Sequence, residues 1–197
     1  MRRKIFRILI PSVIILVFLI FVCVLIDAFS LFDSPFRRHY SATEAIGNFN
    51  KNEIEIYQLV SYFRQLKPSQ KEISFSVNGS RFSLGIGEQD WAIDPKYPRI
   101  WGTDLKLNAA KTDTLIQFLG WNKDNIKDLQ KKLESANCKN IMSEGSVVNI
   151  TYRTDDICSF EYIIYDKPVS DSMTRVYKEA GIRLLRKNVK LAIPCIL

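Results

Sequence analysis

An uncharged apolar segment near the start of the chain is the most regular feature of its hydrophobic pattern. Residues 8–26 contain no charged side chain in 19 positions. As a helix, 19 residues extend over about 28 Å, which nearly matches a hydrocarbon core of about 30 Å. A helix that packs in a soluble core would have a polar stripe, and this segment has none. We therefore expect residues 8–26 to form a transmembrane helix.

Basic residues precede this segment and indicate its orientation. Residues 1–7 contain Arg2, Arg3, Lys4 and Arg7, whereas the first charged residue after the segment is acidic. The positive-inside rule places such a basic flank in the cytoplasm. We therefore expect a single-pass membrane protein that contacts lipid through its apolar segment. The rest of the chain would lie outside the cytoplasm, in a periplasm or the extracellular space.

Two other fates of the apolar segment remain open. A cleaved signal peptide has a shorter apolar core of about 7–15 residues, although Ala28 and Ser30 would suit a cleavage site. Lipidation of Cys23 would require small residues before it, whereas Phe21 and Val22 precede it. The length of the segment favours a retained signal-anchor over both alternatives.

The stretch after the apolar segment has no clear hydrophobic period. Residues 27–48 are interrupted by Ser, Asp and Pro, which is typical of a juxtamembrane linker. The next pattern is helical, and we expect a helix from Asn50 because Asn50 and Glu53 have the spacing of a capping box. Its apolar stripe ends before Pro68 and consists of Ile56, Leu59, Val60, Phe63 and Leu66. The folded domain is therefore expected to occupy residues 49–197.

Alternating apolar and polar residues predict a β-hairpin over residues 73–86. Asn78-Gly79 is a preferred pair for a type I′ turn, and a two-residue turn there places Phe75 opposite Phe82. In that register the apolar residues share one face of the hairpin, and the serines take the other face.

A second hairpin and a final strand are expected in the last third of the chain. Residues 148–164 alternate on either side of a three-residue loop, which would place Ile150 opposite Phe160. Residues 189–195 alternate again. We expect this last strand to form an edge of the sheet, where Pro194 is tolerated.

Two helices are expected between the hairpins, one over residues 112–119 and one from Asn122 onward. Gly120 is suited to end the first helix, and Asn122 is a favourable N-cap for the second. The order of helix, hairpin, helices and strands predicts an α+β domain. We expect one antiparallel sheet with helices packed on one face.

The charge of the whole chain says little about its partners. The net charge is +7, but six of the 28 basic residues and only two of the 21 acidic residues precede residue 39. The remainder of the chain therefore has a net charge of +3. No basic surface of the kind that binds nucleic acid is indicated, so we expect no nucleic-acid partner.

Histidine is nearly absent, and this excludes several kinds of active site. The only histidine is His39, which lies in the expected linker. A Ser-His-Asp or Cys-His triad within the domain is therefore excluded, and so is a zinc site with imidazole ligands. The sequence also lacks a phosphate-binding loop, a dinucleotide fingerprint and a Cys-x-x-Cys motif. We expect no cofactor, no metal and no catalytic residues.

Residues 87–110 form the least regular part of the domain and hold the candidate binding residues. Aromatic rings beside carboxylates suit a sugar or a cation, and binding residues are frequent in long loops. The candidates are Trp91, Tyr97, Trp101, Asp90 and Asp94. Alternatively, the rings fill the edge of the core and the aspartates form turns. A hydrolase that uses Glu88, Asp90 and Asp94 as acid and base is a further alternative.

Three cysteines lie within the expected domain. Cys158 and Cys195 fall on the inward faces of expected strands and are candidates for a disulfide, since an exported domain can be oxidised. Alternatively, they are small buried hydrophobic residues, and Cys138 could pair with either of them. We favour unpaired thiols, because a domain of about 150 residues has a sufficient core without a covalent link.

These patterns favour a binding function over catalysis. We expect the exported domain to bind or scaffold another component of the cell envelope, with a protein as its partner. A secreted or lipid-anchored binding or inhibitor domain is the alternative if residues 8–26 are removed or the chain is lipidated. The sequence does not indicate an oligomeric state.

Overall fold

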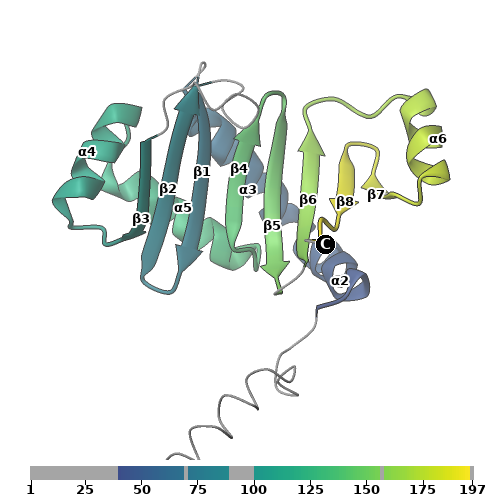
Figure 1. Cartoon of the computed structure of the whole chain (residues 1–197), viewed down its shortest axis with the longest axis horizontal. Helices are drawn as coiled ribbons and strands as arrows, with labels where there is room; N and C mark the ends of the chain where they lie inside the picture. The colour runs from purple at the N-terminus through teal and green to yellow at the C-terminus, as the bar shows by residue number, and fades with distance from the viewer. Residues whose placement is uncertain (1–39, 69–70, 89–99, 156–157, 196–197) are drawn as a thin grey trace, which may run out of the picture. The chain divides into compact units, whose positions relative to one another are not determined.

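An antiparallel sheet of eight strands forms the centre of the domain (Figure 1). The computed structural model describes residues 40–68, 71–88, 100–155 and 158–195. The strand order is β3-β2-β1-β4-β5-β6-β8-β7, and each neighbouring pair is antiparallel. The strands are β1 (Lys71–Asn78), β2 (Arg81–Glu88), β3 (Ile100–Leu105), β4 (Asn140–Glu144), β5 (Val147–Thr154), β6 (Ser159–Tyr165), β7 (Arg183–Arg186) and β8 (Val189–Ala192).

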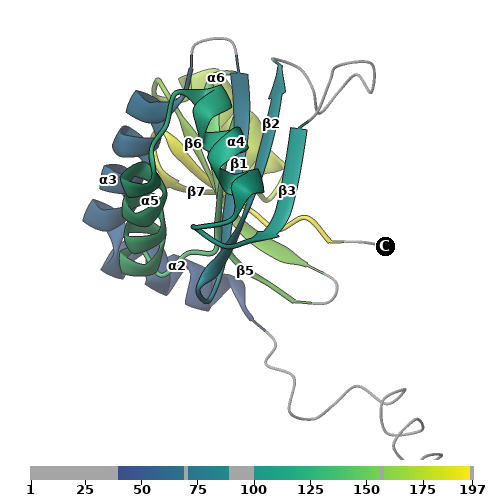
Figure 2. The same cartoon turned by 90° about the vertical axis from the view of Figure 1, so that its left-hand side faces the viewer.

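Three helices lie on one side of this sheet (Figure 2). They are α2 (Ala42–Lys51), α3 (Glu53–Leu66) and α5 (Lys123–Ser135). Helix α4 (Ala110–Leu119) packs beside the edge strand β3, and α6 (Asp171–Glu179) lies next to β7 at the opposite edge (Figure 1). The predicted α+β domain with an antiparallel sheet is therefore confirmed.

Residues 1–39 lie outside the part of the chain that the structure describes. They include the predicted transmembrane helix at residues 8–26 and its basic flank of Arg2, Arg3, Lys4 and Arg7, so both stay predictions. Within the described residues, no helix combines the length and the apolar character that a bilayer span requires.

The apolar faces of the strands meet the stripes of α3 and α5 in one core. On α3, the predicted stripe is buried at Ile56, Leu59, Val60 and Phe63. On α5, which begins after the predicted N-cap Asn122, the buried residues are Ile126, Leu129 and Leu133. Burying a side chain of this size stabilises a fold by about 1.5–3 kcal/mol. The core therefore holds the helices on one face of the sheet.

Helix α2 corrects the predicted boundary of the domain, because residues 40–48 belong to the domain and not to the predicted linker of residues 27–48. Ser41 and Glu44 form a capping box, in which the Glu44 backbone N–H donates to Ser41 Oγ at 3.2 Å. The side chain of Phe49 is fully buried. This anchors the helix in the core.

A buried polar residue is the reason that the pattern did not indicate α2. Asn48 stands within the helix at a position that faces the core, and only 7% of its surface is exposed. It interrupts the apolar period that would otherwise mark the helix. The predicted helix start at Asn50 is therefore wrong, because Asn50 lies inside α2 and Asn52 separates α2 from α3.

The first hairpin is confirmed, but its register differs from the prediction by two residues. The turn is Gly79-Ser80, with Gly79 at a φ of 58°, and Phe75 pairs with Leu84. Glycine occupies the first position of this turn, which is where a type II′ turn requires a positive φ. A shift of two residues leaves each side chain on its predicted face, so the apolar face is as expected.

The second hairpin shows the same shift. Ile150 pairs with Tyr162 instead of Phe160, and a bulge after Thr151 accommodates an extra residue. The final strand β8 is not an edge, because it lies between β6 and β7, and Pro194 follows the strand. Strands β3, β4 and β7 were not predicted. Each has only four to six residues, which is too short for an alternation to stand out.

Candidate functional site

The face of the sheet opposite α3 and α5, here called the open face, carries one continuous row of paired residues. Each member of this central row is directly opposite the next on the neighbouring strand, from β3 at one edge to β7 at the other. The row is Trp101, Gly85, Ser74, Met142, Asn149, Ile163, Lys190 and Leu184. It therefore crosses all eight strands of the sheet.

A groove of about 590 Å³ lies at the β5–β6–β8 end of the open face. Its floor contains Asn149, Ile163 and Lys190 of the central row, and Ile182 and Ile193 line its sides. This volume is within the range of about 300–1,000 Å³ that is common for ligand sites. The groove combines apolar side chains with a few polar groups, which is the usual composition of such sites.

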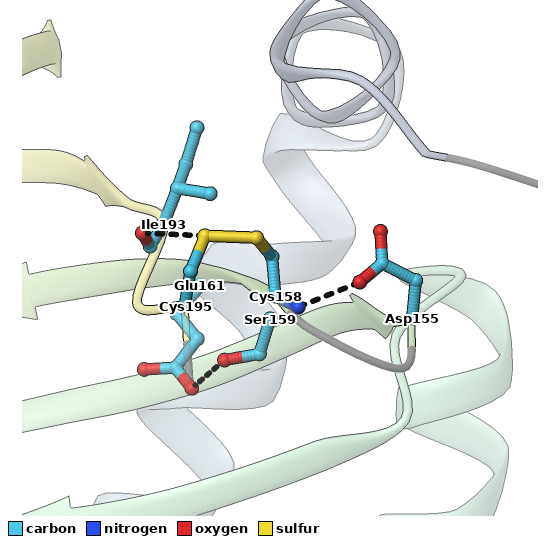
Figure 3. Close-up of a disulfide and its surroundings, with 6 residues drawn as sticks. All are labelled: Asp155, Cys158, Ser159, Glu161, Ile193 and Cys195. Atoms are coloured by element: carbon cyan, nitrogen blue, oxygen red, sulfur yellow. Dashed lines mark hydrogen bonds between the residues drawn. A yellow bond between two sulfur atoms is a disulfide. The ribbon is translucent and has the colours of Figure 1, made fainter. Parts of the chain in front are cut away.

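A disulfide holds the C-terminal side of the groove in place (Figure 3). Cys158 and Cys195 are joined at an S–S distance of 1.99 Å, so the structure has the paired arrangement and not the unpaired thiols that the sequence favoured. Ser159 N–H donates to the Pro194 carbonyl at 2.9 Å. Both links attach the segment that carries Ile193 to the start of β6.

Asn149 contributes an unsatisfied hydrogen-bond acceptor to the groove. Only 8% of its surface is exposed, and its Nδ2 donates to Glu144 Oε2 at 3.0 Å. A carboxylate only accepts, so the amide must turn its NH₂ group toward Glu144. The Oδ1 atom is then buried and has no hydrogen-bond partner. Leaving such an acceptor unpaired costs about 1–3 kcal/mol.

Charged side chains divide the groove into an acceptor end and a cationic end. Glu144 lies at the acceptor end beside Asn149, whereas Glu161 stands on β6 between the two ends, and its Oε1 accepts a hydrogen bond from Ser159 Oγ at 2.7 Å. Lys190 and Arg183 form the cationic end. Among the described residues, no ion pair connects the two ends.

The predicted binding residue Trp101 lies at the other edge of the open face. Its ring covers Gly85 on β2, where a Cβ would approach the ring carbon Cζ3 to 2.1 Å, and 45% of Trp101 is exposed. Neighbouring strands are about 4.8 Å apart, so the four strand spacings to Asn149 amount to roughly 19 Å. Trp101 is therefore not part of the groove.

The other predicted site residues in this loop lie outside the described residues. These are Trp91, Tyr97, Asp90 and Asp94. The side chain of Glu88, a candidate of the hydrolase hypothesis, also lies outside them. The structure therefore leaves both the binding site in the loop and its carboxylate chemistry as predictions.

The sequence does not indicate the groove, because its residues come from five strands and two connecting segments. One signal was present. In β6, Ser159 and Glu161 alternate with buried residues, but Ile163 and Tyr165 continue the same outward face with apolar side chains. Apolar residues on an outward face indicate a covered or functional surface.

A second buried polar cluster lies on the core side, and its hydrogen bonds are satisfied. Asn48 Nδ2 donates to the Tyr162 hydroxyl at 3.1 Å, and that hydroxyl donates to the Ala45 carbonyl at 2.7 Å. Asn137 Nδ2 donates to Asn48 Oδ1 at 2.8 Å. The cluster links α2 to β6 and to the end of α5. It is a structural connection.

The thiol of Cys138 beside this cluster is not suited to catalysis. It is buried, and burial raises its pKa to about 12. The protonated thiol is a poor nucleophile near neutral pH. Among the described residues, no three His, Cys, Asp or Glu side chains lie so that they could hold a metal ion.

No family model matches the chain, and no curated protein or solved structure matches it either. The function is therefore inferred from the geometry of the groove and from the sequence.

Proposed function

We propose that this chain is a single-pass membrane protein whose exported domain binds another component of the cell envelope through the groove on the open face. The unsatisfied Asn149 Oδ1 in the floor of the groove is the observation that carries this proposal. A buried acceptor without a partner is rare in native proteins, and a bound ligand with an N–H or O–H group would supply that partner.

The sequence supports the membrane attachment. Residues 8–26 have the length and composition of a spanning helix, and the domain begins with α2 at Ala42. The 15 residues between them can extend over at most about 50 Å.

The disulfide supports an exported location. Disulfides persist in oxidising compartments and are rare in the cytoplasm. The bridge between Cys158 and Cys195 is therefore the expected state if the domain is across the membrane.

The residues of the groove favour binding over catalysis. Its described lining holds carboxylates, an amide and two cations, but no Ser, Thr, Cys or His side chain that could act as a nucleophile beside a base. Glu144 and Glu161 each accept a hydrogen bond from a neutral side chain, which suits recognition of a donor group.

Site-specific photo-crosslinking in the native cells tests this proposal. A photoreactive residue in place of Ile193, at the edge of the groove, should give a distinct crosslinked product with an envelope component. The matched control is the same residue in place of Ile54 on α3, which is 70% exposed and lies on the other side of the domain. Identical products from both positions, or none from Ile193, would overturn the binding role of the groove.

Protease treatment of the same cells tests the topology. A C-terminal tag should be digested once the outer barrier is opened. A tag that is digested only after the inner membrane is broken would contradict the exported location.

A further inference from the structure

We infer that the groove binds a peptide through a lysine side chain, with the ammonium group at the acceptor end and a carboxylate of the same peptide at the cationic end. This inference deepens the proposed function and rests on it. It names the class of ligand from the arrangement of acceptors, cations and apolar side chains in the groove.

The unsatisfied atom defines one property of the ligand. Asn149 Oδ1 can only accept, and its orientation is set by the bond from Nδ2 to Glu144. The ligand must therefore present a donor to it.

The carboxylate beside this atom makes a cationic donor the best fit. Glu144 is held against Asn149, whereas Glu161 lies on β6, diagonal to both Asn149 and Lys190. Neither carboxylate has an ion-pair partner among the described residues. An ammonium group has three N–H donors, so it can bond to the amide oxygen and to the Glu144 carboxylate together.

The cationic end indicates that the ligand is not simply an amine. Lys190 faces the groove, with its Nζ 5.3 Å from the centre of the Tyr177 ring, and Arg183 is exposed beside it. These two charges would repel a second ammonium group and attract a carboxylate. A ligand with both charges therefore matches the groove better than a diamine does.

The separation of the two ends fits a peptide. Asn149 and Lys190 lie on β5 and β8, with only β6 between them, so their backbones are roughly 10 Å apart. A lysine side chain and one further residue of extended backbone, at about 3.3–3.6 Å per residue, cover this distance. Between the ends, Ile163, Ile182 and Ile193 can cover the methylene groups of the lysine.

Other classes of ligand fit the groove less well. Sugars bind well against aromatic rings, and the described lining contains no aromatic side chain. Nucleotides and other phosphate-rich ligands would be repelled by Glu144 and Glu161.

Calorimetric titration of the full chain in detergent micelles tests the inference. The probe is the dipeptide acetyl-Lys-Gly with a free carboxylate. Acetylation of the lysine ammonium should weaken binding at least about tenfold, because charge-assisted hydrogen bonds are lost. Amidation of the carboxylate should weaken it about threefold to tenfold.

A charge reversal separates this inference from its alternatives. In Lys190→Glu, the free-carboxylate dipeptide should bind at least about threefold more weakly, whereas 1,5-diaminopentane should bind more tightly than it does to the wild type. The matched control is Lys187→Glu in the β7–β8 turn, which makes the same charge change outside the groove and should alter neither affinity. Thermal unfolding of both variants checks that the fold is retained.

Four results would overturn the inference. Equal binding of 1,5-diaminopentane and the dipeptide to the wild type would assign an amine ligand, and tighter binding of phosphoethanolamine would assign a lipid headgroup. Absence of dipeptide binding, with the crosslink from Ile193 still formed, would reject a lysine peptide but leave the proposed function intact. Loss of the crosslink as well would reject both.

Discussion

Two asparagines of this domain are almost equally buried but have opposite hydrogen-bonding states. Asn48 lies on the core side with 7% of its surface exposed, and Asn149 lies on the open face with 8% exposed. Asn48 donates from its amide group and accepts from Asn137 and Asn52, whereas Asn149 leaves its Oδ1 unpaired. Burial alone therefore does not distinguish these two residues, whereas the state of their hydrogen bonds does.

The largest predicted effect concerns the disulfide, which lies beside the groove that contains Asn149. Cys158 and Cys195 are 37 residues apart in the sequence, so removing the bridge should lower the free energy of unfolding by about 4 kcal/mol, from the entropy of the unfolded loop. Denaturant unfolding of the Cys158→Ala, Cys195→Ala double variant measures this change.

The same variant should also bind ligand more weakly at the groove, because the segment with Ile193 is no longer held. Cys138→Ala is the matched control, since it removes a buried sulfur on the core side and leaves the groove unchanged. If reduction left both unfolding and the Ile193 crosslink as they were, the bridge would have no part in shaping the groove.

The second prediction compares the two asparagines directly. Asn48→Ala should lower the free energy of unfolding by about 3 kcal/mol, because Tyr162 and Asn137 lose partners in a buried site. Asn149→Ala should change it by less than about 1 kcal/mol, because the variant loses one bond but also removes an unsatisfied acceptor. Both values come from urea titrations of the full chain in micelles. Similar costs at the two positions would remove the distinction drawn here.

The third prediction concerns pH and the core side. Burial raises the pKa of Cys138 from an ordinary 9.0 to about 12, so the folded state holds this proton where the unfolded state releases it. The stabilising contribution is fully present below pH 9 and is lost as the pH rises toward 12. Each such group makes the free energy of unfolding fall with pH by up to about 1.4 kcal/mol per pH unit.

Unfolding of Cys138→Ala between pH 8 and 11 checks this slope, which should be shallower than in the wild type but not flat. Tyr162 remains as a second group whose pKa is raised by burial, and its effect has the same sign. An unchanged slope would show that the Cys138 thiol is accessible. Reaction of that thiol with a maleimide in the folded protein at pH 8 would show the same.

The smallest predicted effect lies at the other end of the central row. Gly85→Ala would place a Cβ against the Trp101 ring, so the ring must move, and we expect a loss of about 1 kcal/mol. In a Trp101→Ala background the same change should cost clearly less, which a double-mutant cycle measures. Neither substitution should alter ligand binding at the groove. A change in binding would mean that the whole open face acts as one surface.

The local hydrophobic pattern was sufficient to predict those elements whose periodicity is long and uninterrupted. Helices α3 and α5, the cap at Asn122 and the inward face of each predicted hairpin strand follow from neighbours in the sequence. Both hairpin registers differed by two residues because alternation has a period of two, so a shift of two preserves each face. Where the turn lies depends on backbone conformation, as Gly79 shows with its positive φ.

The sequence by itself therefore determined the fold class, the faces of the strands and the expectation of a membrane anchor. Only the tertiary structure decided the strand order, the pairing of Cys158 with Cys195 and the groove. The reason is physical: periodicity reports which side of an element is apolar, whereas a site depends on which elements become neighbours. Asn149 and Glu161 belong to one hairpin, but Lys190 comes from outside it, and only the order β5-β6-β8 places all three together.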